Sequence, residues 1–128
     1  MEFKVKDLMM SPLVTTTKDS TIDYIRELME RKNIQAIPIV ESKDNLEVIG
    51  VITSSDLRGI SNGSALVKEY MTNEIYWVRA EVDAEIAGRI MLEEGVHHLL
   101  VKSEEKIVGM LSSLDFVRLV SEKNFMMV

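Results

Sequence analysis

The chain contains two similar segments, and this internal repeat limits the folds it can adopt. The first copy opens with Val5–Met9 and closes with Gly50–Asp56, and the second opens with Val67–Met71 and closes with Gly109–Asp115. The offset is 62 residues from Val5 to Val67 but 59 from Asp56 to Asp115, and the deletion falls in the polar stretch Ser42–Glu47. Paired repeats bury together what one copy leaves exposed, and they create two equivalent clefts suited to a small ligand.

The composition limits the size and the class of the protein. A chain of 128 residues allows one compact module, which we divide into residues 1–61 and 62–128. The net charge is -6 and the basic residues are scattered, which disfavours a nucleic-acid partner. The absence of cysteine excludes thiol chemistry and fits a cytoplasmic protein. No apolar run approaches the roughly 18 residues of a membrane span, so we expect no membrane partner.

Each copy predicts the order strand, helix, strand, strand, helix, which is an α+β arrangement. Short apolar and β-branched runs predict strands over residues 12–17, 34–40, 48–52, 75–79, 96–101 and 107–111.

Capping patterns place the helices. A capping box at residues 20–23 precedes an amphipathic helix that ends near Asn33, with an inward stripe of Ile22, Ile25, Leu28 and Met29. In the second copy, Asp83 is expected to cap a helix that ends at Gly95, with Ile86, Ile90 and Met91 inward. Thr53-x-x-Asp56 and Ser112-x-x-Asp115 open the last helix of each copy.

These features together resemble a tandem CBS-domain pair, also called a Bateman module. The resemblance rests on the duplicated element order, on the opening Met9 and Met71, on the apolar strand Ala36–Val40 with its Pro38, and on the following Gly-apolar-apolar-Thr-x-x-Asp motif. It covers residues 5–120. It implies two CBS repeats that pack through their sheets around a pseudo-two-fold axis.

The resemblance also implies a function. CBS pairs are regulatory modules that bind AMP, ADP, ATP, S-adenosylmethionine or NAD between the repeats, signal to an effector protein and commonly form homodimers. No cofactor is required, and the ligand acts as a regulator. The sequence contains no Gly-x-Ser-x-Gly, phosphate-loop or His–carboxylate metal motif, so we do not expect an enzyme or a metal site.

The site residues are carried over from the family pattern onto two composite sites. The Asp of the closing motif would hold the ribose diol, because a carboxylate has two accepting oxygens. Site A would join Thr53 and Asp56 to Tyr76, Trp77 and residues 96–100, which include His97, His98 and Leu100. Site B would join Ser112 and Asp115 to Val14, Thr15, Thr16, Ala36, Ile37 and Pro38.

The second copy departs from the family pattern, and several residues have simpler interpretations. It has Leu100 in place of the strand proline, and neither copy has the arginine that often precedes the Asp. Arg58 and Arg118 are the nearest cations, and helix geometry points them away from residues 55 and 114, which disfavours ATP. Thr53-x-x-Asp56 and Ser112-x-x-Asp115 are also capping boxes, and a capping residue can at the same time face a ligand.

Four other features have alternative interpretations. Pro38 is equally an edge-strand proline. His97 and His98 point to opposite faces, so at most one faces a ligand; the alternative is a solvated or core histidine. Trp77 is either a base-stacking ring or a hydrophobic anchor at an interface. The apolar tail Phe125–Val128 suggests a dimer contact or disorder.

Two functions follow from these observations. The first is the ligand-sensing module, in which binding shifts the module between two arrangements. The alternative is a structural module for dimerisation or partner docking, with degenerate sites. The absent arginine and the absent second proline favour this alternative, and saturable nucleotide binding would favour the first.

Overall fold

The computed structural model describes residues 3–11 and 13–123, and the chain divides into two compact α+β units. The copy-1 unit is Val14–Ile75, and the copy-2 unit is Met1–Leu13 together with Tyr76–Val128. The copy-1 unit contains β1 (Thr16–Thr17), α2 (Ile22–Lys32), β2 (Ala36–Val40), β3 (Val48–Thr53), α3 (Ser54–Leu57) and the 3-10 helix η1 (Val67–Glu69). The copy-2 unit contains α1 (Val5–Leu8), β4 (Trp77–Arg79), α4 (Ala84–Glu94), β5 (His98–Ser103), β6 (Lys106–Ser112) and α5 (Ser113–Lys123).

The predicted element order is confirmed in both units, and each unit has one three-stranded sheet. The strand orders are β1-β2-β3 and β4-β5-β6, with the first pair parallel and the second antiparallel. The first two strands of each copy begin later than expected: β1 begins at Thr16, and Pro12 lies outside the described residues. The copies differ in the loop between the antiparallel strands, which is residues 41–47 in the first copy and 104–105 in the second.

Helix α2 forms as its pattern predicts, with one change at its start. Its inward stripe of Ile22, Ile25, Leu28 and Met29 is buried, and Asn33 ends it in the left-handed conformation at φ 53°. The N-cap is Thr21, whose Oγ1 accepts the N–H of Tyr24 at 3.2 Å. Ser20 is therefore not the cap, as a box at residues 20–23 would require; its Oγ lies 2.6 Å from Oγ1 of Thr16.

Helix α4 confirms two of the three residues predicted to face inward, because Met91 is buried and Ile90 packs partly buried against the same core. Ala84, Ala87 and Met91 are buried, whereas Ile86 is exposed, so its inward placement is wrong. Because the helix begins at Ala84, the inward face follows steps of three and four residues from there. Gly95 ends α4 as predicted, at φ 66°. Among the described residues no helix combines the length and apolar character needed to cross a membrane.

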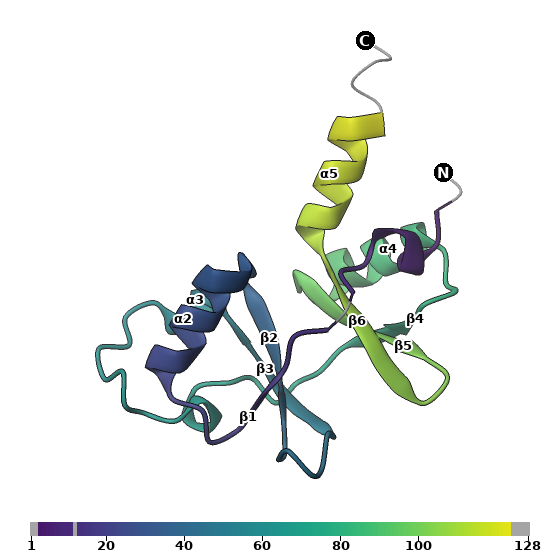
Figure 1. The fold of residues 1–128 in the computed structure, drawn as a ribbon. Coiled ribbons are helices and arrows are strands. Elements are labelled where there is room, and N and C mark those ends of the chain that lie inside the picture. The colour runs from purple at the N-terminus through teal and green to yellow at the C-terminus, as the bar shows by residue number, and fades with distance from the viewer. Residues whose placement is uncertain (1–2, 12, 124–128) are drawn as a thin grey trace. The chain divides into compact units, whose positions relative to one another are not determined.

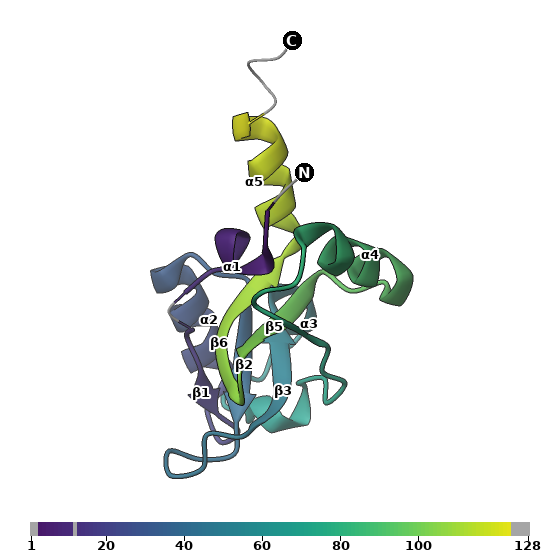
Figure 2. The ribbon, with the colours of Figure 1, turned by 90° about the vertical axis from the view of Figure 1, so that its right-hand side faces the viewer.

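The first residues of each copy pack on the unit built from the other copy. Residues 3–10, here called arm 1, lie against the copy-2 unit, where α1 contacts α4 and α5 (Figures 1 and 2). The Val5 N–H donates to Val82 O at 2.8 Å, and Met10 and Met110 exchange two backbone hydrogen bonds. Val5 is fully buried in the core of this unit, beside Val78, Leu99 and Leu111.

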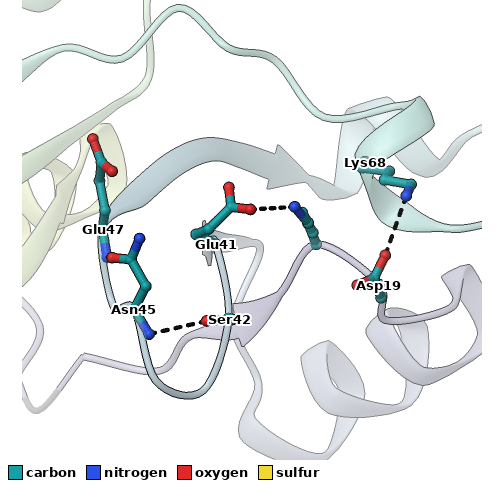
Figure 3. A network of polar contacts seen from close by, with 7 residues as sticks. Asp19, Glu41, Ser42, Asn45, Glu47 and Lys68 are labelled. Atoms are coloured by element: carbon teal, nitrogen blue, oxygen red, sulfur yellow. Dashed lines mark hydrogen bonds and ion pairs between the residues drawn. The ribbon is translucent and has the colours of Figure 1, made fainter.

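Residues 65–72, here called arm 2, repeat this arrangement on the copy-1 unit. The Val67 N–H donates to Ser20 O at 2.8 Å, and Thr72 and Val51 exchange two backbone hydrogen bonds. Lys68 also forms an ion pair with Asp19 at 3.2 Å, which Figure 3 shows next to the loop held by Ser42 and Asn45. In each unit, the segment that opens the other copy therefore forms one isolated antiparallel bridge with the last strand of the sheet.

Candidate ligand-binding site

The carboxylate of Asp56 lies at the start of α3 and caps it. Strand β3 ends at Thr53, and the chain turns directly into the helix. Thr53 Oγ1 accepts the Asp56 N–H at 3.3 Å, and Asp56 Oδ2 accepts the Thr53 N–H at 2.9 Å. The capping role predicted for this box is confirmed. Asp56 is half-buried.

Asp115 occupies the equivalent position in the first turn of α5, with more partners. Its Oδ2 accepts the Ser112 N–H at 2.8 Å and lies 3.4 Å from Ser112 Oγ. Its Oδ1 accepts a hydrogen bond from Nη1 of Arg118 at 2.9 Å, and Asp115 is only 8% exposed. The Arg118 side chain, which helix geometry was expected to point away from residue 114, therefore reaches the candidate carboxylate of Asp115. Residues 115 and 118 are neighbours on one helix face because they are three apart.

The apolar strand that carries Pro38 is the central strand of its sheet. All five residues of β2 are buried, and β2 pairs with both β1 and β3. The edge-strand interpretation of Pro38 is therefore wrong. In the copy-2 unit, the Leu100 N–H donates to Tyr76 O at 2.9 Å.

Pro38 removes the equivalent hydrogen bond from the copy-1 unit. Because proline has no N–H, no bond from position 38 to Val14 O can form. Strand β4 begins at Trp77, which corresponds to Thr15 in the first copy. Strand β1 accordingly begins one residue later, at Thr16. The Val14 carbonyl is thus left without the bond that Tyr76 makes.

Trp77 is the only tryptophan, and two cations flank its ring. Its exposed fraction is 45%, while the neighbouring Val78 faces the core. The Lys102 Nζ lies 4.2 Å from the ring centroid, and the Arg79 guanidinium carbon lies 5.5 Å from it. These distances are within the range of cation–π attraction. Arg79 and Lys102 were not among the predicted site residues. The signal that could have indicated them is their spacing, since each lies two residues after Trp77 or Leu100 on paired strands and therefore on the same face of the sheet.

The two histidines differ in environment. His97 is exposed, whereas His98 is half-buried and pairs with Ser112 across β5 and β6. Burial lowers the pKa of His98, the neighbouring His97 lowers it further, and the charge of Asp115 acts in the opposite direction. His98 is thus the histidine nearer to the candidate carboxylate.

The His98 environment predicts a pH-dependent stability. Its folded pKa lies below the unfolded value of about 6.5, so the unfolded chain takes up the proton first as the pH falls. The stability of the copy-2 unit should therefore decrease as the pH falls below about 6.5, and the loss should level off below the folded pKa. Urea denaturation of His98→Gln should lack this part of the pH dependence, whereas His97→Gln, at the exposed neighbour, should keep the larger part of it, which comes from the burial of His98. Equal pH profiles for parent and His98→Gln would contradict the prediction.

Each unit brings part of the candidate site together. In the copy-1 unit, Ala36 pairs with Thr53 across β2 and β3, close to Asp56. In the copy-2 unit, His98 pairs with Ser112, close to Asp115. The remaining candidates lie along the neighbouring strand segments: Val14, Thr15, Thr16, Ile37 and Pro38 in one unit, and Tyr76, Trp77, His97 and Leu100 in the other. No group of three or more metal-ligating side chains is found within residues 3–11 and 13–123.

Comparisons with known proteins agree with the duplicated architecture. A family model described as CBS domain matches residues 5–63 and 67–122. Inosine-5'-monophosphate dehydrogenase from Streptococcus pyogenes serotype M3 is 36% identical over 107 residues, which cover 81% of this chain and 22% of that protein. The chain thus spans about a fifth of the length of that relative.

Two solved structures are similar over nearly the whole chain. The CBS domain pair of protein MJ0100, in complex with 5'-methylthioadenosine and S-adenosyl-L-methionine, has a TM-score of 0.84 at 22% identity, covering 96% of this chain and 99% of that one. CBSX2 in complex with AMP has a TM-score of 0.79 at 25% identity, covering 95% and 98%.

Proposed function

The chain belongs to the CBS domain family, and from this premise we propose that it is a regulatory module that binds an adenosine-containing small molecule and signals to a partner protein. The observation that carries the proposal is the pair of carboxylates, Asp56 and Asp115, that follow the last strand of each unit at a helix start. A carboxylate in this position can accept both hydroxyl groups of a ribose.

The other candidate residues are proposed as contacts of the same ligand. Thr53 and Ser112 each add a hydroxyl beside a carboxylate. The apolar segments would contact the adenine, and the Val14 carbonyl is available as an acceptor. The full set proposed is Val14, Thr15, Thr16, Ala36, Ile37, Pro38, Thr53, Asp56, Tyr76, Trp77, His97, His98, Leu100, Ser112 and Asp115.

The class of ligand is proposed from chemistry and from the relatives. Similar solved structures hold 5'-methylthioadenosine, S-adenosyl-L-methionine and AMP, which share a ribose with a free diol. Lys102 and Arg79, which flank Trp77, supply cations for a phosphate or carboxylate group. We therefore propose AMP, ADP, ATP, S-adenosylmethionine and NAD as the candidates.

A thermal-shift screen against these five compounds tests the proposal. A ligand at 100 times its Kd should stabilise the fold by about 2.7 kcal/mol, which gives a clear increase in Tm. Trp77 fluorescence should change with the same saturation curve. Guanosine and cytidine serve as controls, because they carry the ribose but not the adenine. Flat curves with all five compounds at millimolar concentration would rule out the ligand-sensing role.

A second function, homodimerisation or partner docking, is favoured by the apolar surface of α5. Leu114, Val117 and Val120 are all exposed on this helix. Exposed apolar side chains grouped on one element often mark an interface with another protein. Sedimentation of the free protein would test it: a dimer that Val117→Glu converts to a monomer supports the interface, and a monomeric parent contradicts the homodimer.

A further inference from the structure

The two candidate ribose-binding carboxylates differ in one partner. Asp56 and Asp115 are equivalent in the repeat, and the residue equivalent to Arg118 is Gly59, since both lie three positions after the carboxylate. Helix α3 ends at Leu57, and Gly59 follows at φ 82°. Helix α5 instead continues to Lys123 and carries Arg118 one turn beyond Asp115. Only the second carboxylate therefore has a cation within its own helix.

The hydrogen bonds leave the two carboxylates with different accepting capacity. A carboxylate offers about four lone-pair positions, and a ribose diol uses two of them. Within residues 3–11 and 13–123, the Asp56 carboxylate accepts one bond, from the Thr53 N–H. Asp115 accepts from the Ser112 N–H and from Arg118, and Ser112 Oγ lies 3.4 Å from its Oδ2. The diol can thus bind to Asp56 without displacing any partner.

Charge and burial act in the same direction. The bond from a guanidinium to a carboxylate is charge-assisted and stronger than a bond between neutral groups. The Asp115 side chain is 8% exposed and that of Arg118 is 57% exposed, so the pair is partly buried and less screened by water than a pair of two fully exposed groups. A neutral hydroxyl group that replaces Arg118 must therefore overcome this ion pair. At Asp56 no such pair has to be broken.

We propose that Asp56 is the carboxylate that holds the ribose of the first ligand bound, and that Arg118 acts as a specificity residue that keeps Asp115 occupied. This inference rests on the proposed function. Removing the charge of Arg118 frees the second carboxylate for a diol. The protein then binds two ligands of similar affinity, where the parent binds one tightly.

Calorimetric titration of the full chain with AMP and with 5'-methylthioadenosine tests the inference. Asp56→Asn and Asp115→Asn each keep an amide oxygen that can accept the capping N–H, so the helix start is preserved. Arg118→Gln removes the charge and keeps most of the side-chain length. Arg89→Gln, at an exposed position on α4, is the matched control for loss of one positive charge. Titration with 2',3'-dideoxyadenosine against adenosine shows whether the diol is recognised.

The expected results separate the two carboxylates. The parent should bind one ligand, and Asp56→Asn should weaken this binding at least tenfold and by a larger factor than Asp115→Asn does. Arg118→Gln should add a second binding event at least tenfold tighter than any second event of the parent, and Arg89→Gln should not.

Three other results would overturn the inference. Loss of the first event in Asp115→Asn but not in Asp56→Asn would assign the ribose to the other carboxylate. Weaker binding by Arg118→Gln would make Arg118 a ligand contact. A parent that binds neither compound would overturn the proposed function as well.

Discussion

The Val5→Asp variant is expected to unfold the copy-2 unit under conditions in which the parent protein is folded. Val5 belongs to arm 1 and is 0% exposed in the core of this unit, beside Val78 and Leu99. A carboxylate there would have no cation beside it in this apolar core and would lose its hydration. The free energy of unfolding should decrease by more than about 4 kcal/mol, which is a large part of the stability of a small unit.

Urea denaturation followed by Trp77 fluorescence measures this loss, because the only tryptophan lies in β4 of the same unit. The control is Leu92→Asp, which places the same carboxylate on α4 at a side chain that is 85% exposed. Its unfolding free energy should stay within about 0.5 kcal/mol of the parent value. Similar losses in both variants would show that arm 1 does not belong to the core.

Hydrogen exchange distinguishes the unit that loses stability. The amides of β5 and β6 should exchange faster in Val5→Asp, although Val5 belongs in sequence to the first copy. Val67→Asp should accelerate exchange in β2 and β3, because Val67 is fully buried in the copy-1 core. If each substitution instead destabilised the unit built from its own copy, the packing of each arm on the other copy's unit would be contradicted.

The element order could be predicted from the sequence because local signals determine it. The stripe of α2, its end at Asn33 and the two capping boxes each depend on residues a few positions apart. The packing of each arm on the unit of the other copy depends on contacts between residues far apart in the chain, such as the hydrogen bond from Val5 to Val82. Such a pair leaves no local pattern, and the start of a repeat is naturally assigned to its own copy. The exposure of Ile86 was not predicted although Asp83 correctly marks the start of α4, because the small residues Ala84 and Ala87 occupy the inward face instead.

The candidate site was predictable only in part, for a similar reason. The capping roles of Asp56 and Asp115 follow from four-residue patterns, and both are confirmed by hydrogen bonds. The contact of Arg118 with Asp115 depends on the length of α5, because the short α3 brings no equivalent side chain back to Asp56. The central position of Pro38 depends on strand pairing, and a proline in a short apolar run does not reveal it.

The Gly109→Ala variant is expected to displace arm 1 from β6. A Cβ at position 109 would lie 2.7 Å from Met10 O and 2.9 Å from Met9 Sδ. The thioether can move, but Met10 O is held by the N–H of Met110 at 3.2 Å, and the Met10 N–H returns a bond of 2.8 Å to Met110 O. Relief of the overlap therefore requires the loss of both bonds. Overpacking and these two bonds together should cost about 3 kcal/mol.

Gly88→Ala is the matched control, because it makes the same change in the same unit with the opposite expected sign. The nearest atoms to a Cβ at position 88 belong to the Phe116 ring, at an ordinary contact distance of 3.6 Å. Alanine in the interior of α4 should raise the unfolding free energy by about 0.5 to 1 kcal/mol. Urea denaturation with Trp77 fluorescence measures both variants, and hydrogen exchange should show faster exchange of the Met10 amide in Gly109→Ala alone. A higher unfolding free energy for Gly109→Ala than for the parent would mean that β6 tolerates a side chain next to arm 1. Gly109 would then not be required for arm 1 to pack on β6.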